Sequence, residues 1–186
     1  DFGNAVIRKI TGAGEVTTLA GVVGEEAVVD GAGRSARFRR PCALASDAVG
    51  NLYVFDDQTV RKVTPSGEVT TLAGEAGAKG IVDGQGKAAR FSQVYGLAVD
   101  GAGNLYATEC ANHVIRKITP SGEVTTLAGK ANDPATVDGQ GGAARFASPM
   151  GLALDGAGNL FVGEASGALR QISPTGEVTT VGGKAG

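Results

Sequence analysis

Hydrophobic and polar positions alternate in short runs that glycine-containing turns separate along the chain. Some runs, such as Gly-Leu-Ala-Val at 96–99, are uniformly small and apolar, which is typical of an innermost strand covered on both faces. Others, such as Val-Thr-Thr-Leu at 124–127, mix β-branched and polar positions, which favours an outer strand. No window shows a 3.6-residue apolar period, so helix is expected at most as single turns around 88–91 and 143–146. The pattern predicts an all-β fold.

These runs belong to a unit that repeats at a regular spacing. Residues 116–129 recur at 61–74 with a single change, and looser copies occupy 8–21 and 170–183. The same place in the four copies is held by the glutamates at positions 15, 68, 123 and 177, so the steps are 53, 55 and 54 residues. A fixed period of this length is the signature of a repeat protein whose copies are supersecondary units.

Each full copy predicts four strands. Its first two strands are separated by a cluster of Asp, Gly and Asn, such as residues 100–104, which supplies the positive φ values of a tight turn. The predicted strands are 5–10 and 15–20, then 42–47, 52–55, 59–63 and 68–73, then 96–100, 105–108, 114–118 and 123–128, and finally 151–155, 160–162, 168–172 and 177–181. Four antiparallel strands repeated radially describe a propeller blade. The chain is therefore predicted to form a half-blade at 1–21 and blades at 42–74, 96–129 and 151–183.

Several short motifs recur in register from copy to copy. They include Gly-Leu-Ala-Val-Asp at 96–100, Gly-Asn-Leu-Tyr at 103–106, Asn112-His113 before the third strand, and a connection that holds Asp-Gly-x-Gly and Ala-Arg-Phe. Together they resemble the NHL repeat family of β-propellers in its long bacterial form, and the resemblance covers almost the whole chain. It implies a β-propeller of NHL type. Only one copy keeps the histidine, so the resemblance implies no role for a ring of histidines.

The three full blades and the half-blade make only a partial ring. Members of the resembled family commonly close six blades by letting one chain end donate the missing strands, which this sequence does not do. An open arc exposes strand edges and apolar faces, which soluble proteins avoid. The sequence therefore predicts either a portion of a longer propeller or a homo-oligomer that completes the ring. Because the two central copies are nearly identical, a self-assembling or engineered fragment is a third interpretation.

Composition narrows the functional classes. The 186 residues carry a formal net charge of -2, so the chain lacks the global positive field that attracts nucleic acid or anionic lipid. No run of 18 apolar residues is present, and the sequence opens directly into the repeat without a leader. We expect no nucleic-acid partner and no membrane partner. The family resemblance implies an extracellular or cell-envelope location.

Metal-ligating residue types occur without the partners that such sites need. His113 is the single histidine, and we expect it to make a local hydrogen bond, because a zinc site needs three or four ligands. Each Asp-Gly-x-Gly motif offers one carboxylate, too few for a calcium loop, and we expect it to pair with the arginine seven residues later. The expected pairs are Asp30 with Arg37, Asp83 with Arg90, and Asp138 with Arg145. No metal, cofactor or catalytic residue is predicted.

Two other sets of recurring side chains fit structural roles. Phenylalanines repeat with the period and are expected to fill the gaps between neighbouring blades; they are Phe38, Phe91 and Phe146. The Arg-Lys pairs of the third strands, and the basic cluster at 37–40, are expected on a solvated charged face rather than at an RNA site. RNA recognition needs a broad positive surface with stacking aromatic side chains, whereas a glutamate follows each pair in the next strand.

Two cysteines leave the redox compartment open. We place Cys42 at the position that glycine holds at Gly96 and Gly151, and Cys110 in a loop between second and third strands, on the same face. A disulfide between them across two blades is one prediction, and two free thiols are the other.

The variable loop positions carry the functional prediction. Residues where first strands begin, and where second strands join third strands, differ between copies, while the strands hardly vary, as in a scaffold that diversifies one surface. We expect a non-enzymatic binding or interaction scaffold whose partner is a protein or a small ligand. The expected face consists of Cys42, Phe55, Asp57, Tyr95, Glu109, Asn112, His113, Met150 and Glu164. The alternative is a propeller-type lyase or lactone hydrolase with a bound divalent metal.

Overall fold

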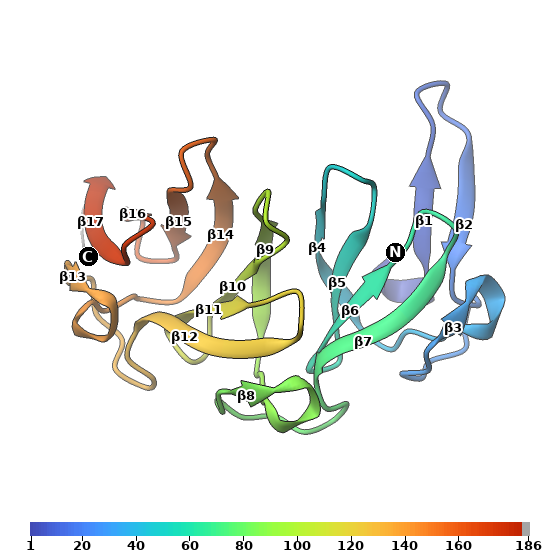
Figure 1. Ribbon diagram of the computed structural model, residues 1–186, viewed down its shortest axis with the longest axis horizontal. Coiled ribbons are helices and arrows are strands. Elements are labelled where there is room, and N and C mark those ends of the chain that lie inside the picture. The colour runs from blue at the N-terminus through green and yellow to red at the C-terminus, as the bar shows by residue number, and fades with distance from the viewer. Residues whose placement is uncertain (184–186) are drawn as a thin grey trace.

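The chain forms an arc of propeller blades, described for residues 1–183 in a computed structural model (Figure 1). Antiparallel sheets follow one another in chain order, from the half-blade to the sheet that contains the last strand. Within residues 1–183 the helical segments are short 3-10 turns: η1 (Phe2–Asn4), η2 (Gly33–Ser35), η3 (Gly86–Ala88) and η4 (Gly141–Ala143). The all-β prediction of a partial propeller is confirmed. The turns expected at 88–91 and 143–146 lie two residues earlier than predicted.

The half-blade and three complete blades appear as four separate sheets. The half-blade pairs β1 (Ile7–Ile10) with β2 (Val16–Ala20). From the inner to the outer edge, the first blade contains β4 (Pro41–Ser46), β5 (Leu52–Asp56), β6 (Thr59–Val63), β7 (Glu68–Gly74) and β3 (Gly31–Ala32). The second contains β9 (Val94–Val99), β10 (Leu105–Glu109), β11 (Val114–Ile118), β12 (Glu123–Gly129) and β8 (Gly84–Gln85). The third contains β14 (Pro149–Leu154), β15 (Leu160–Glu164), β16 (Leu169–Ile172), β17 (Glu177–Gly182) and β13 (Gly139–Gln140).

Each complete blade has a fifth strand that the sequence pattern did not predict. The connection between blades runs back along the outer edge of the blade that follows it, so β3, β8 and β13 pair with β7, β12 and β17. Gly84 begins one of these strands at φ 157°, and a Cβ there would lie 3.3 Å from the Cβ of Ala88. The two-residue strands cap the first two residues of each outer strand, whose backbone groups would otherwise be free to pair with another chain.

The hydrophobic core is divided among the gaps between sheets. Each of three buried clusters combines side chains from two neighbouring sheets around one fully buried phenylalanine of the connection. These phenylalanines are Phe38, Phe91 and Phe146, each 0% exposed, which confirms their predicted role. In the middle cluster Phe91 meets Phe55 edge to face, with ring centroids 6.1 Å apart. The blades are therefore held together by side chains from the connections as much as by the strands.

The inner strands lie close together along one side of the arc, where β9 packs between β4 and β14 (Figure 1). A Cβ at Gly96 of β9 would lie 2.6 Å from the carbonyl oxygen of Met150, so only glycine fits at this crossing. The Thr108 hydroxyl fills the remaining space, donating to the Met150 carbonyl at 2.7 Å and accepting from the Gly96 N–H at 2.8 Å. This spacing brings the starts of the first strands to one face of the molecule.

The strand register corrects the predicted position of Cys42. Val94 of β9 pairs with Glu109, and Pro41 of β4 pairs with the corresponding acid, Asp56. Cys42 therefore corresponds to Tyr95 and Met150, one residue before the glycine position. The prediction was wrong because Ala43, and not Cys42, takes the place of the glycine in the first blade.

Candidate ligand-binding site

A pocket of about 570 Å³ opens on the face where the first strands begin. Its size is within the range of small-molecule sites in proteins. It lies at the boundary between the first and second blades, and its lining extends from the 3-10 turn before the half-blade to the β10–β11 loop. The lining residues are Phe2, Arg40, Cys42, Phe55, Asp57, Gln58, Lys79, Ser92, Gln93, Val94, Tyr95 and Ala111.

A tight turn shapes the wall that the first blade contributes. Asp57 and Gln58 are the two residues between β5 and β6, with φ of 45° and 67°. Two successive positive φ values are the geometry of a two-residue hairpin, and they are strained for residues with side chains. Both side chains are nearly buried, at 6% and 7% exposure. The second and third blades have longer loops at this place, so this wall is particular to the first blade.

Two buried acids hold the backbone segment that carries Arg39 and Arg40. Asp56, at the end of β5, is 0% exposed and accepts hydrogen bonds from the backbone N–H groups of Arg39 and Arg40 at 2.9 and 2.7 Å. Asp57 pairs with Nη1 of Arg39 at 3.2 Å. Burial raises the pKa of Asp56, while these N–H groups and Arg61 oppose the rise. Arg40 and Lys79, both exposed, form no ion pair with any residue in 1–183.

The structure brings together only part of the face predicted from the sequence. Four predicted residues line the pocket: Cys42, Phe55, Asp57 and Tyr95. Asn112 and His113 are partly buried in the β10–β11 loop beside Ala111, and Met150 is 40% exposed on the third blade, outside the pocket lining. Glu109 and Glu164 are 0% and 7% exposed and pair with buried arginines, so the structure places these two carboxylates inside the blades and away from the face.

Buried arginines correct two predictions about charged residues. The first residue of each Arg-Lys pair, and its equivalent in the third blade, is 0% exposed; these are Arg61, Arg116 and Arg170. They were expected on a solvated face, and that expectation was wrong because the preceding connection, with its phenylalanine and aspartate, covers the face of the blade that each arginine occupies. Their partners are also not those predicted. The three aspartates of the connections pair with these arginines, and not with the arginines seven residues later.

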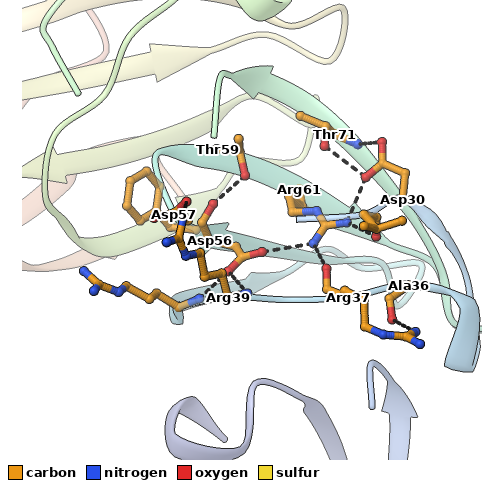
Figure 2. Close-up of polar contacts among 12 residues, drawn as sticks. Asp30, Ala36, Arg37, Arg39, Asp56, Asp57, Thr59, Arg61 and Thr71 are labelled. Carbon is orange, nitrogen blue, oxygen red and sulfur yellow. Dashed lines mark hydrogen bonds and ion pairs between the residues drawn. The ribbon is translucent and has the colours of Figure 1, made fainter. Parts of the chain in front are cut away.

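The contacts of Arg61 show how each buried arginine ties its blade to the preceding connection (Figure 2). Its guanidinium donates to Asp56 at 3.0 Å, to Asp30 at 2.8 Å, and to the backbone carbonyls of Val29 and Arg37, and it lies over the ring of Phe38. One arginine thus binds its own blade to the connection before it. Of the guanidinium nitrogens of Arg61, only the buried Nε has no hydrogen-bond partner among the described residues.

The aspartates of the connections also accept hydrogen bonds from the outer strands. Asp30 accepts hydrogen bonds from the N–H and the hydroxyl of Thr71, at 2.8 and 2.9 Å. Burial raises the pKa of Asp30, but the hydrogen bonds from Thr71 and Arg61 outweigh it and leave the pKa below its usual value. Arg37, its predicted partner, instead pairs with Glu25 at 2.6 Å. The Asp-Gly-x-Gly motif is therefore a structural joint between connection, third strand and fourth strand.

The imidazole of His113 makes one hydrogen bond to residues 1–183, and it is not local. Its Nδ1 accepts from the backbone N–H of Ser148 at 3.1 Å, on the connection that leads into the third blade. His113 has φ of 60°, and a Cβ at Gly129 would lie 2.6 Å from its carbonyl oxygen. The histidine therefore joins two blades. In residues 1–183 no three His, Cys, Asp or Glu side chains are grouped so that they could hold a metal ion.

Both cysteines are free thiols, so the predicted alternative of a disulfide is wrong. The Cys42 thiol points to the backbone carbonyls of Phe55 and Val94, at 3.6 and 3.7 Å, and burial raises its pKa. It therefore bridges the two blades as a weak donor and is not positioned as a nucleophile.

The sequence interpretation missed most of the polar residues that line the pocket, including Arg40, Gln58, Lys79 and Gln93. One signal was available in the sequence: the pair Arg39-Arg40 of the first connection is replaced by Ser92-Gln93 in the second, so these positions vary between copies as the predicted face does.

No helix within residues 1–183 is long and apolar enough to cross a membrane.

Comparisons with known proteins support the fold. No known family and no curated protein matches the sequence. Among solved structures, an auxiliary nutrient binding protein from Bacteroides thetaiotaomicron is 21% identical, with a TM-score of 0.68 over 88% of this chain and 41% of that one. The virginiamycin B lyase from Staphylococcus aureus is 14% identical, with a TM-score of 0.64 over 98% of this chain and 50% of that one. A gluconolactonase from Xanthomonas campestris is 17% identical, with a TM-score of 0.53 over 76% of this chain and 46% of that one. The chain spans half or less of the length of each, and the likeness to them establishes the propeller fold.

Proposed function

We propose that the protein is a non-enzymatic binding scaffold built from NHL-type blades, with its ligand site in the pocket between the first and second blades. The observation that carries the proposal is where the variation between copies lies. Equivalent positions such as Cys42, Tyr95 and Met150 differ and lie exposed on one face, while the buried arginine network repeats in all three blades. A constant frame with a varied rim favours recognition of a ligand.

The comparisons are compatible with this proposal at the level of the fold. One neighbour is described as an auxiliary nutrient binding protein. We propose a location outside the cell or in the cell envelope, which would suit a comparable role and which the family resemblance also implies. We further propose that arcs of this kind act within a larger or oligomeric ring, since a scaffold with a complete ring presents its loops on one continuous face.

The enzymatic alternative is a metal-dependent lyase or lactone hydrolase, for which other neighbours supply the precedent. Such a centre needs at least three protein ligands around an open coordination position. His113, the single histidine of the sequence, already accepts a hydrogen bond through Nδ1. A binding role therefore requires fewer additions to the described residues than a metal centre does.

A ligand screen with two variants tests the proposal. Small polar metabolites would be screened by ligand-observed NMR, and hits would be mapped by amide chemical shifts. Tyr95→Ala, which removes a 48%-exposed ring from the pocket wall, is expected to weaken binding about tenfold or more. Val49→Ala changes an exposed apolar residue in the β4–β5 turn, at the opposite end of the strands, and is the control.

The outcome separates the two functions. Hits that shift Tyr95 and Cys42 and are lost in Tyr95→Ala support a binding site in the pocket. Hits that shift other regions and are indifferent to Tyr95→Ala would refute this location. Metal-dependent turnover of a lactone by the wild type would favour the enzymatic alternative.

A further inference from the structure

We propose that the pocket selects a small organic anion that carries an apolar ring, an inference that rests on the proposed binding function and adds its ligand class. Two independent observations support it. The rim carries positive charge that no described residue neutralises, and the walls are aromatic and aliphatic. The protein as a whole has a net charge of -2, so the positive rim is a local reversal of the overall charge.

The charge argument starts from the buried acids. Asp57 is the one acidic residue in the lining, and it is already paired with Arg39. Asp56 is directed away from the pocket toward Arg61 and the backbone N–H groups of Arg39 and Arg40. The cations Arg40 and Lys79 both line the cavity, one just before β4 and the other in the connection before β9. A carboxylate between them would be neutralised by the fork of Arg40 and the point charge of Lys79.

The backbone of Arg40 is held in place before any ligand arrives. Its backbone N–H donates to buried Asp56 at 2.7 Å, and Pro41, which follows it, is buried at the start of β4. Binding through this side chain therefore does not also have to order the backbone that carries it. The equivalent residue of the second connection is Gln93 and that of the third is Ser148, so only the first of the three positions carries a cation.

The apolar walls provide the second part of the recognition. Phe55 and Val94 form the floor and are 4% and 1% exposed, whereas Tyr95 and Phe2 remain 48% and 61% exposed. The hydroxyl of Tyr95 is held at 2.8 Å by the amide of Gln93, which orients the ring at the rim. A ring inserted between these side chains would remove apolar surface from water on both partners. A cavity of about 570 Å³ accommodates one or two fused rings with a carboxylate.

The test compares 2-naphthoate with 2-naphthamide, which has a similar shape and no charge. Binding to the whole chain would be measured by calorimetry and by amide chemical shifts at low ionic strength. The acid is expected to bind at least about tenfold more tightly than the amide, and the preference should decrease with added salt. Arg40→Gln and Lys79→Gln should each bring the two affinities closer. Arg34→Gln, an exposed arginine of the same connection that lies outside the lining, should leave the preference unchanged.

Each result decides the inference. Equal binding of acid and amide with shifts at Tyr95 would overturn the anion preference and leave the proposed ligand site in place. A loss of preference in Arg34→Gln as large as in Arg40→Gln would also overturn it, because net charge alone would explain the effect. Absence of shifts at the pocket with either probe would exclude ring-bearing ligands here, while the metabolite screen decides the binding function itself.

Discussion

The half-blade and the complete blades carry the same sequence pattern in different surroundings. Ile10 and Val16 of the half-blade are 69% and 47% exposed, whereas the equivalent Ile118 and Val124 of the second blade are 0% and 1% exposed. Arg8 is exposed, while its equivalent Arg116 is 0% exposed. The residues are the same or nearly so, and therefore the difference comes from what covers them.

Three elements around the second blade have no counterpart beside β1 among the described residues. They are the inner pair of strands, β9 and β10, the preceding connection with Asp83 and Phe91, and the first blade, which packs on the same face. All three bury the apolar side chains, and the connection and Glu109 of β10 supply the acceptors that hold the arginine. The third and fourth strands of a blade thus form a sheet by themselves, but their side chains become buried and paired only where these neighbouring elements are present.

The largest expected difference is between Arg116→Ala and Arg8→Ala. Removing Arg116 leaves Glu109 buried without its charged partner, which should lower the free energy of unfolding by about 3–5 kcal/mol. The same change at Arg8, an exposed position, should alter it by less than about 0.5 kcal/mol. Urea unfolding followed by circular dichroism would give both values.

Two results would break this part of the comparison. If Arg8→Ala cost as much as Arg116→Ala, the half-blade in solution would be covered by a partner that resembles a connection and an inner strand pair. If Arg116→Ala cost little, the buried network would serve specificity of packing more than stability. The double variant Arg116→Ala with Glu109→Ala separates the cost of the lost contacts from that of the buried unpaired acid.

A smaller difference is expected between Ile118→Ala and Ile10→Ala. Ile118 belongs to the cluster around Phe91, and its truncation should cost about 2–5 kcal/mol. Ile10→Ala should cost less than about 0.5 kcal/mol, because most of its side chain already contacts water. The same unfolding measurement gives both values, and equal costs would mean that the face of the half-blade is covered in solution.

Adding an inner strand pair to the half-blade would test the comparison of Ile10→Ala with Ile118→Ala directly. Residues 94–108, placed directly before Asp1, would supply an inner strand pair to the half-blade, because Asp1 corresponds to Glu109 and contacts Asn4 as Glu109 contacts Asn112. In this longer chain Ile10→Ala should cost more than in the original chain but less than Ile118→Ala, because Phe91 and the first blade, which also cover Ile118, have no counterpart there. An unchanged, small cost for Ile10→Ala in the grafted chain would show that an inner strand pair does not contribute to the burial of this position.

Much of the fold could be predicted because the copies repeat in register. The third strands at 59–63 and 114–118 coincide with β6 and β11. The fifth strands could not be found, since two residues such as Gly84–Gln85 are too short to show any periodicity. Their pairing depends on how the connection turns back, which is decided by tertiary contacts.

The site was only partly predictable, for a physical reason that the arginines illustrate. A strand covered on one face alternates buried and exposed residues, so an Arg-Lys pair can be expected to point at least one charge to water. In the first blade Lys62 is the partly exposed charge and Arg61 is the buried one, because the preceding connection covers the face that Arg61 occupies and supplies its acceptors. Glu109 and Glu164 were assigned to the ligand face for the same reason, since nothing local in the sequence shows that an arginine on the next strand faces them.

The smallest expected difference between the half-blade and the complete blades is in how their carboxylates affect stability at acidic pH. Asp155, in the β14–β15 turn, accepts hydrogen bonds from the side chain and backbone of Asn159 and from the N–H of Ala157, and these hold its pKa below the usual value. A carboxyl with a lowered folded-state pKa contributes stability that is present above its unfolded pKa and is lost as the pH falls through the folded value. The half-blade has no turn of this kind among the described residues. Asp155→Asn should therefore flatten the decline of the urea midpoint between about pH 5 and pH 2. The control is Glu15→Gln, which changes a half-blade carboxylate that accepts no hydrogen bond from residues 1–183. This variant should show the same decline of the urea midpoint as the wild type. If both variants flattened the decline equally, the acid sensitivity would come from net charge and not from the turns of the complete blades.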